Sequence, residues 1–280
     1  MKLLTDTWPF SLVKPEQQYS GRLVGTGDPS AIHIEGPPGA GAVLAFHGYA
    51  GSPREVRVVT DAGAELGFSA HAPRLPGHGP TATSLLSVGW SDWVAAAQSE
   101  LMRVVQTSRS RVVVAGLSLG SLLATHLAAT FREQVAGLIV LANALHLRRR
   151  TASPLLLFER FAPLDNRFSI VKKAPDIRDP AARSAHVTYD INPIRGAVEV
   201  LRAGRIVRGE LGNVVCPALV IHGALDRVCP PSNAYDFARR LGTSNVEIAI
   251  MPSSGHIVSV DYDRQAVAAH VAAFLRRVLP

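Results

Sequence analysis

Short apolar segments alternate along the chain with longer segments in which apolar residues recur every three or four positions. The first pattern is typical of buried strands and the second of amphipathic helices. The strand-like segments, rich in Val, Ile and Ala, span 42–46, 68–72, 111–115, 135–141, 218–221 and 246–250. Because strands that alternate with helices form parallel sheets covered on both faces, we predict an α/β protein with a mostly parallel, doubly wound sheet.

Helical signals fill the intervals between these strands. Apolar periodicity predicts helices over 90–107, 233–241 and 263–278. The tetrapeptide at 52–55 (Ser-Pro-Arg-Glu) has the composition of a capping box with a proline at the first helical position. We expect a helix from there to Leu66, ended by Gly67.

The alternation stops between residues 145 and 209. This stretch shows no strand-like segment, contains five prolines and carries more charge than its surroundings. We interpret it as a mainly helical lid inserted at the carboxyl edge of the sheet, where a connection can expand without disturbing the core. The core would then comprise residues 1–144 and 210–280. The first thirty residues are expected to form a strand pair of their own.

Candidate chemistry begins with the pentapeptide at 116–120 (Gly-Leu-Ser-Leu-Gly), which lies between a predicted strand and a helix-like segment at 121–130. A G-x-S-x-G turn in this context holds its serine in a strained conformation at the end of a strand, and the glycines prevent collisions. Ser118 is therefore a candidate nucleophile. The alternative is a buried serine that only caps the following helix.

A serine hydroxyl needs a histidine to accept its proton and a carboxylate to orient that histidine. His256 follows the last predicted strand, and Asp226 follows the strand before it. Both positions are loops at the carboxyl edge, where Ser118 also lies. The alternatives are a loop histidine bonded to backbone and an ordinary turn aspartate.

At this point the chain resembles the α/β-hydrolase superfamily over nearly its whole length, and within it the bacterial carboxylesterase and monoacylglycerol lipase group. The resemblance rests on 46–53 (Phe-His-Gly-Tyr-Ala-Gly-Ser-Pro), 74–79 (Arg-Leu-Pro-Gly-His-Gly), 116–120, 222–226 (His-Gly-Ala-Leu-Asp) and 255–256 (Gly-His). The order serine, aspartate, histidine is the one found in these enzymes. The resemblance implies an oxyanion hole made by the backbone N–H groups of Tyr49 and Leu119.

His47 and His78 belong to two of these motifs, and His222 ends a predicted strand. We expect the first two to hold loops in place rather than to carry protons. His222 is expected to be a residue at the edge of the core.

Composition narrows the possible partners. The chain has 280 residues, 47% of them hydrophobic and 18% charged, which is enough for one large core. A net charge of +7 favours anionic partners, and three arginines are consecutive at 148–150. The basic residues are otherwise scattered and lack interleaved aromatics, so we expect no nucleic-acid binding. A solvated face is the default interpretation of the arginines, with weak binding to anionic lipid surfaces and steering of anionic substrates as alternatives.

No signal peptide or membrane-length apolar segment is visible in the sequence, so we expect a cytoplasmic protein without a membrane span. The cysteines, Cys216 and Cys229, flank a predicted strand that would hold them too far apart for a disulfide. We therefore expect free thiols.

Together these features predict a serine hydrolase that cleaves short- to medium-chain acyl esters or monoacylglycerols through an acyl-enzyme on Ser118, His256 and Asp226. Neither a cofactor nor a metal is expected. An acyltransferase or perhydrolase and a carbon–carbon bond hydrolase could use the same three residues. A ligand-binding member of the fold without turnover is the alternative from a different class.

Overall fold

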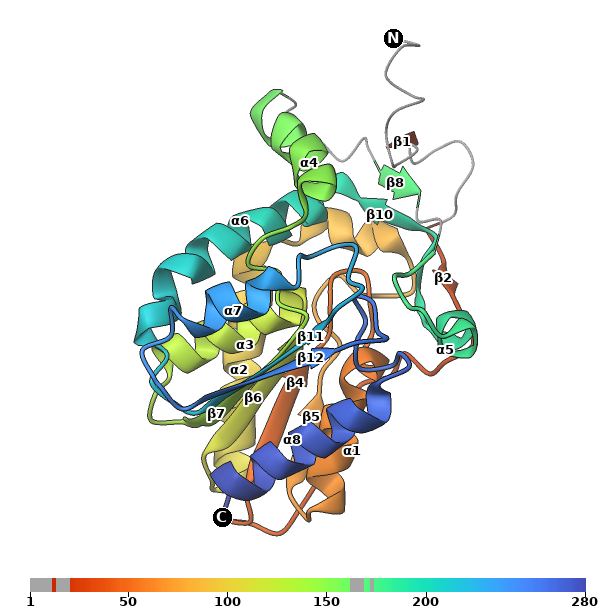
Figure 1. Cartoon of the computed structure of the whole chain (residues 1–280). Helices are drawn as coiled ribbons and strands as arrows, with labels where there is room; N and C mark the ends of the chain where they lie inside the picture. Colours follow the sequence, from red (N-terminus) through yellow and green to blue (C-terminus); the bar gives the residue numbers. More distant parts are fainter. Residues whose placement is uncertain (1–11, 14–20, 162–168, 172–173) are drawn as a thin grey trace.

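The computed structural model describes residues 12–13, 21–161, 169–171 and 174–280, and its centre is a seven-stranded sheet (Figure 1). The sheet has the strand order β12-β11-β7-β6-β4-β5-β3, and all neighbours are parallel except β3 and β5. The strands are β3 (Ile32–Ile34), β4 (Ala42–Phe46), β5 (Ser69–Ala72), β6 (Val112–Leu117), β7 (Val135–Leu141), β11 (Ala218–Gly223) and β12 (Val246–Met251). The six predicted strands are confirmed, each to within two residues at either end.

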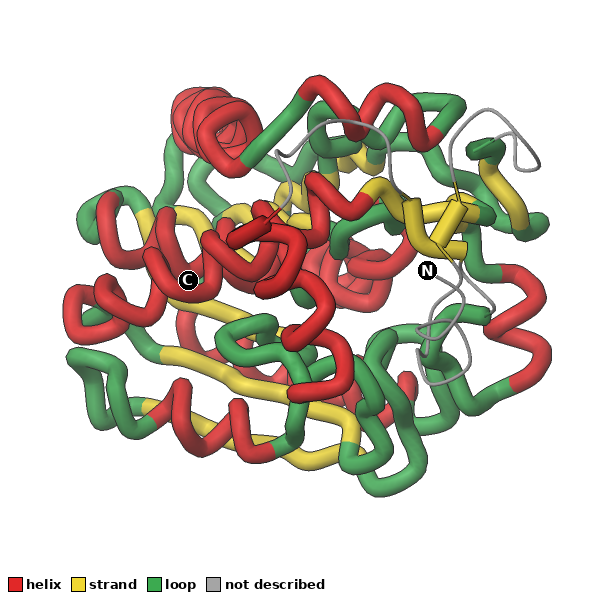
Figure 2. The backbone as a smooth tube through the Cα atoms, turned by 90° about the horizontal axis from the view of Figure 1, so that it is seen from above, coloured by secondary structure: helices red, strands yellow, loops and turns green. Residues whose placement is uncertain are grey.

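Helices cover both faces of this sheet (Figures 1 and 2). One face carries α1 (Arg57–Glu65) and α8 (Arg264–Val278); the other carries α2 (Trp90–Ser108), α3 (Leu119–Thr130), α6 (Ile194–Glu210) and α7 (Ser232–Ala238). Along β4 the side chains alternate between two apolar clusters. Leu44 and Phe46 pack with the α2 and α3 side, and Val43 and Ala45 with the α1 and α8 side. The doubly wound sheet is thus confirmed.

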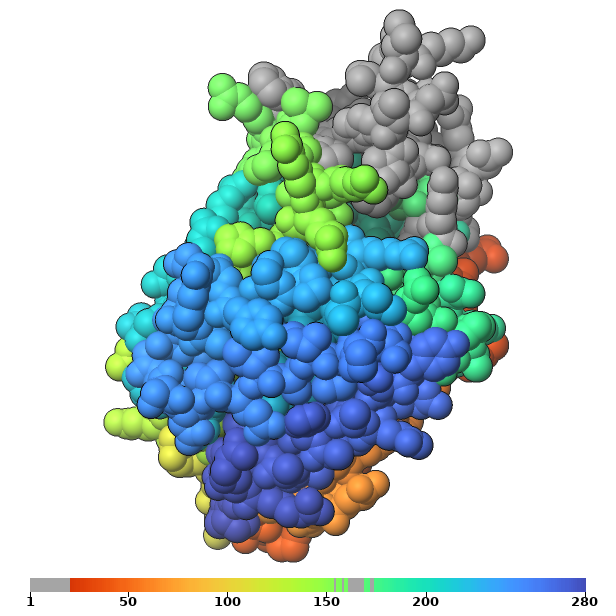
Figure 3. All heavy atoms as spheres, viewed as in Figure 1, coloured from red at the N-terminus to blue at the C-terminus, as the bar shows by residue number. Residues whose placement is uncertain are grey.

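Segment 145–209 differs in part from the prediction. It contains helices α4 (Arg149–Phe161), α5 (Pro180–Ala185) and α6, but also the short strands β8 (Ser169–Val171), β9 (Thr188–Tyr189) and β10 (Ile191–Pro193). In Figure 1, α4, β8 and β10 lie at the end of the molecule opposite the C-terminus, and in Figure 3 the atoms of α4 project from that end. The role of this segment as a lid and its boundaries remain predictions.

The expected strand pair among the first thirty residues is wrong for the residues that the structure describes. β1 (Leu12–Val13) pairs with β8, and β2 (Leu23–Val24) pairs with β9, so both strands join segment 145–209. Strands of two or three residues are too short to show a period, and their partners lie more than a hundred positions away.

The predicted capping box is also wrong. Ser52 does precede the turn η1 (Pro53–Val56) that leads into α1, but its side chain makes no cap hydrogen bond. Its hydroxyl oxygen is buried without a partner among the described residues. The Glu55 carboxylate instead accepts a hydrogen bond from the Gly48 N–H at 2.8 Å. Glu55 is buried beside the loop after β4, where a buried amide needs an acceptor.

Cys216 and Cys229 are buried free thiols, as expected. None of the helices in the described part of the chain combines the length and the apolar content needed to cross a bilayer.

The packing around the turn after β6 generates a stability prediction. A Cβ atom at Gly120 would collide with the carbonyl oxygen of Phe46, a backbone atom that cannot move aside, whereas Gly212 has no atom within 4 Å of such a position. We expect Gly120→Ala to lower the free energy of unfolding by about 3 kcal/mol or more, and Gly212→Ala to change it by less than about 1 kcal/mol. Urea unfolding followed by circular dichroism measures both; equal effects would contradict the prediction.

Candidate active site

Ser118 lies between β6 and α3 with φ of 55° and ψ of −112°, a strained conformation for a residue with a side chain. The backbone is held there because the Ser118 N–H donates to the Leu141 carbonyl at 3.0 Å and two glycines allow close approach. A Cβ atom at Gly116 would collide with the carbonyl oxygen of Gly120. This geometry is that of a nucleophile elbow, and it presents Ser118 to a cavity.

His256 and Asp226 are joined by a hydrogen bond of 2.8 Å between Nδ1 and Oδ2. Asp226 is fully buried, and its other oxygen accepts the N–H groups of Val228 at 2.7 Å and Cys229 at 2.8 Å. An ionised carboxylate can only accept, so the His256 proton lies on Nδ1 and Nε2 is free to accept one. This is the arrangement that a general base needs.

The cavity brings the predicted residues together. It has a volume of about 1470 Å³ and is lined by Ser118, Asp226, His256 and Tyr49, among others. Among the described residues no hydrogen bond links the Ser118 hydroxyl to the His256 ring. Such contacts are often long without substrate and tighten when it binds.

Burial and the carboxylate act in opposite directions on His256. Burial disfavours the imidazolium, but the charge and hydrogen bond of Asp226 outweigh this effect and raise the pKa of His256 above its usual value. For Asp226, burial opposes ionisation, and the nearby His256 and His222 overcome it, so the pKa of Asp226 is lowered. The negative charge of Asp226 therefore stabilises a positive charge on His256.

The two amides expected to bind an oxyanion have no acceptor among the residues that the structure describes. Gly48 N–H donates to Glu55 and Ala50 N–H donates to His78 Nε2 at 3.0 Å, but no described residue accepts from the Tyr49 N–H between them. Leu119 is the first residue of α3, where an N–H has no acceptor within the helix. The helix dipole adds positive potential at that point.

Two buried histidines hold the loop around Tyr49, as the sequence predicted. His47 Nδ1 bonds the Gly48 carbonyl at 2.9 Å, and its Nε2 accepts the Leu75 N–H at 3.1 Å. His78 bonds the Pro76 carbonyl through Nδ1 at 3.1 Å while accepting from Ala50. Burial lowers the pKa of both rings, that of His78 to about 4, so both act as neutral clamps.

The Tyr49 side chain serves a different purpose from its amide. Its hydroxyl donates to the Pro193 carbonyl at 2.7 Å, and a Cβ atom at Gly196 would collide with the ring. Burial raises the pKa of Tyr49. Tyr49 therefore anchors the start of α6 to the loop after β4.

His222 was predicted to be an edge residue, but it is fully buried with Nε2 at 3.0 Å from Oδ2 of Asp226. The alignment falls short of a hydrogen bond, so the contact is an electrostatic one. The clue in the sequence was its spacing of four residues from Asp226 across a tight turn. Asp226 thus has two imidazoles on one oxygen.

Sequence reasoning also missed two carboxylates, one in segment 145–209 and one after β12, that bind the loops carrying Asp226 and His256. Asp176 Oδ2 accepts the N–H groups of Arg227 at 2.8 Å and His256 at 3.1 Å. Asp261 accepts the Gly255 N–H at 2.8 Å. The loops after β11 and β12 are therefore tied together by amide-to-carboxylate bonds, a signal that no local pattern carries.

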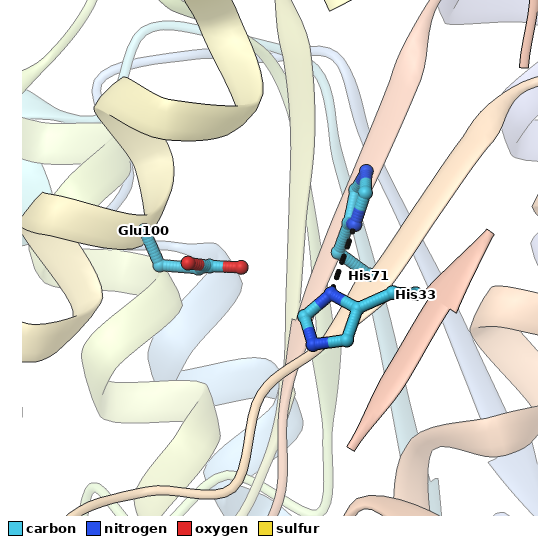
Figure 4. A group of neighbouring side chains, drawn as sticks. All are labelled: His33, His71 and Glu100. Carbon is cyan, nitrogen blue, oxygen red and sulfur yellow. Dashed lines mark hydrogen bonds between the residues drawn. The ribbon is translucent and has the colours of Figure 1, made fainter. Parts of the chain in front are cut away.

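Two groups of described residues bring three potential metal ligands within 4.8 Å. One is Asp226, Cys229 and His256, in which both oxygens of the Asp226 carboxylate already accept hydrogen bonds. The other, His33, His71 and Glu100, lies away from the cavity, and its rings come from neighbouring strands and face Glu100 of α2 (Figure 4). There the Arg103 guanidinium bonds both Glu100 oxygens and lies 3.2 Å from His71 Nδ1, so a cation already occupies the group.

Comparisons with known proteins agree with this geometry. Residues 37–263 match the model of the Hydrolase_4 family, described as "Serine aminopeptidase, S33". The chain is 28% identical to a thermostable monoacylglycerol lipase of Bacillus sp. strain H-257 over 83% of this chain and 88% of the relative. It is 22% identical to a carboxylesterase of Bacillus subtilis strain 168 over 85% of this chain and 93% of that one.

Solved structures show the same fold. A structure reported for LipS and LipT, two metagenome-derived lipolytic enzymes, superposes with a TM-score of 0.80 at 26% identity, covering 91% of this chain and 99% of that one. A monoglyceride lipase of Saccharomyces cerevisiae superposes with a TM-score of 0.75 at 15% identity, covering 98% and 99%. The predicted α/β-hydrolase fold is confirmed.

The contacts of Asp226 predict how activity depends on pH. The pKa of His256 is raised, so kcat/KM should fall on acidification at a midpoint above the ordinary value of about 6.5. His222→Leu removes a positive dipole beside Oδ2, makes Asp226 more basic and should move that midpoint further up, whereas His222→Gln retains a donor and should restore it in part. An unchanged midpoint in the leucine variant would contradict this electrostatic effect of His222 on Asp226.

Because His47 and His78 are buried in their neutral form, we expect the folded chain to lose stability in acid. The pKa of His78 is about 4 in the folded chain and about 6.5 when unfolded, so the unfolded state binds the proton first as pH falls. The free energy of unfolding should therefore decrease between pH 6.5 and 4, with about 3 kcal/mol from His78 and a contribution of the same sign from His47. His78→Asn should flatten this dependence in urea titrations; an equally steep loss in the variant would refute it.

Proposed function

We propose that this chain, which belongs to the Hydrolase_4 family, hydrolyses carboxylic esters through an acyl-enzyme on Ser118. The observation that supports this most strongly is the site itself. A strained serine, a histidine protonated on the nitrogen that faces a buried carboxylate, and Tyr49 border one cavity, and the Leu119 amide directly follows the serine.

Each group then has one role. Ser118 Oγ attacks the acyl carbon while His256 Nε2 accepts its proton, and Asp226 stabilises the resulting imidazolium. The N–H groups of Tyr49 and Leu119 bind the negative oxygen, each worth roughly 3–4 kcal/mol in such sites. His256 passes the proton to the leaving alcohol, and a water molecule activated by the same ring releases the acid.

The cavity lining favours an acyl ester with an aliphatic chain. Apolar side chains from several elements border it, as in pockets for apolar ligands: Leu147, Leu155, Ile170, Val200 and Val228. The relatives named as a monoacylglycerol lipase and a carboxylesterase support the same assignment. We therefore propose short- to medium-chain acyl esters, including monoacylglycerols, as substrates.

An aminopeptidase activity, as the family description would suggest, fits this site less well. Binding a free α-ammonium group requires an available carboxylate. Of the carboxylates in the cavity lining, Glu55 and Asp226 are buried and bound to backbone N–H groups, which leaves only Asp176, and six arginines make up the rest of its charged lining besides His256. A positively charged amino terminus would meet like charges there.

The test compares wild type, Ser118→Ala and the control Ser244→Ala on p-nitrophenyl esters from C2 to C16, monoacylglycerols and an aminoacyl p-nitroanilide. Ser244 is exposed just before β12, at the end of the sheet away from the cavity. We expect ester turnover in wild type and the control, a loss of about 10⁴-fold or more in Ser118→Ala, and no anilide cleavage. Ester turnover that survives in Ser118→Ala would overturn the proposal.

A further inference from the structure

Six arginines surround the entrance of the catalytic cavity, and we call them the arginine rim. They are Arg148, Arg149, Arg150, Arg178, Arg183 and Arg227, and all are exposed. They come from three separate parts of the chain: the start of α4, the region of α5 and the loop after β11. Three of them were noted in the sequence as a run of charge, but only the fold brings the other three to the same entrance.

The arginine rim is not neutralised within the part of the chain that the structure describes. No ion pair there includes any of the six residues, although eight other arginines have acidic partners: Arg57, Arg103, Arg202, Arg205, Arg239, Arg240, Arg264 and Arg277. The cavity is also lined by three carboxylates, Glu55, Asp176 and Asp226, which offset only half of the six arginine charges. The entrance therefore has a positive potential that an incoming anion meets first.

Two of the rim arginines, Arg148 and Arg227, lie on the His256 side of the site. Arg148 Nε donates to the Asp226 carbonyl at 2.9 Å. The Arg227 N–H shares the carboxylate of Asp176 with the N–H of His256. Three hydrogen bonds thus tie Arg148 and Arg227 to the loops that carry Asp226 and His256.

That side is where the alcohol part of an ester must lie. His256 has to protonate the leaving oxygen, so the leaving alcohol projects from Ser118 toward His256 while the acyl chain projects away from it. A charge on the alcohol would therefore lie toward Arg148 and Arg227, whereas a charge at the far end of the acyl chain would lie away from these two.

We propose, building on the proposed ester hydrolysis, that the preferred substrates are esters whose alcohol carries a phosphate or carboxylate group, such as an acylated glycerol phosphate. Guanidinium groups bind both anions through paired N–H donors. Water and the ester give the fatty acid and the intact phosphorylated alcohol: the acyl C–O bond breaks, the leaving oxygen takes the proton from His256, and the phosphate is untouched.

The test uses two substrates that differ only in the anionic group, 1-octanoylglycerol and 1-octanoylglycerol 3-phosphate, below their critical micelle concentrations so that the rim meets single molecules rather than a surface. We expect kcat/KM to be at least tenfold higher for the phosphate ester at low ionic strength, with the ratio falling as salt screens the rim. The octanoyl ester of glyceric acid distinguishes the two anions: a similar preference indicates a carboxylate site as well.

The variant Arg149→Gln/Arg227→Gln should lower the ratio of the two kcat/KM values about three- to tenfold, the size expected for two exposed charge pairs. The matched control is Arg276→Gln, an exposed arginine at the end of α8 that has no acidic partner among the described residues, and it should leave the ratio as in wild type. Equal losses in both variants would overturn the assignment to the rim.

Three further outcomes distinguish a failure of this inference from a failure of the proposed ester hydrolysis. Turnover of the neutral ester with a ratio near one refutes the anionic preference and leaves ester hydrolysis standing. A preference for mono-p-nitrophenyl glutarate over p-nitrophenyl valerate, without one for the glycerol phosphate, would place the anion on the acyl side and refute the proposed position. Inactivity on every ester refutes both proposals.

Discussion

The carboxylate of Asp226 is the interaction on which the arrangement of the site depends. One oxygen binds the backbone N–H groups of Val228 and Cys229, and the other contacts the rings of His256 and His222. A buried charge is tolerated only when such donors surround it. Because these partners come from β11, the loop after it and the loop after β12, the same charge that raises the pKa of His256 also ties those elements together.

Carboxylates bind backbone amides of other loops around the cavity as well. Loops at the carboxyl edge of a parallel sheet have backbone amides without ladder partners, and burying them unpaired would be costly. Here side-chain carboxylates accept hydrogen bonds from these amides. Glu55 binds the N–H of Gly48, Asp176 that of His256, and Asp261 that of Gly255. The Tyr49 and Leu119 amides have no acceptor among the described residues, and the bonded Gly48 and Ala50 amides hold the Tyr49 N–H between them.

Local patterns in the sequence were sufficient for the features that depend on local order. The six strands of the parallel sheet and the turn at Ser118 follow from short apolar runs and glycine spacing, and the resemblance to a known family supplied the order of Asp226 and His256. The features that were missed depend on contacts between distant residues. The strand β8 is three residues long and pairs with a strand more than 150 positions earlier. Glu55 has the spacing of a capping residue, but its carboxylate binds the buried Gly48 amide instead.

Covalent labelling tests the central claim, that Asp226 and His256 make Ser118 a nucleophile, most directly. A fluorophosphonate probe followed by peptide mass spectrometry should give a single adduct on the peptide that contains Ser118. Labelling should be slowed about a thousandfold or more in both Asp226→Asn and His256→Gln. An adduct on another serine, or labelling of Ser118 at the wild-type rate in either variant, would contradict it.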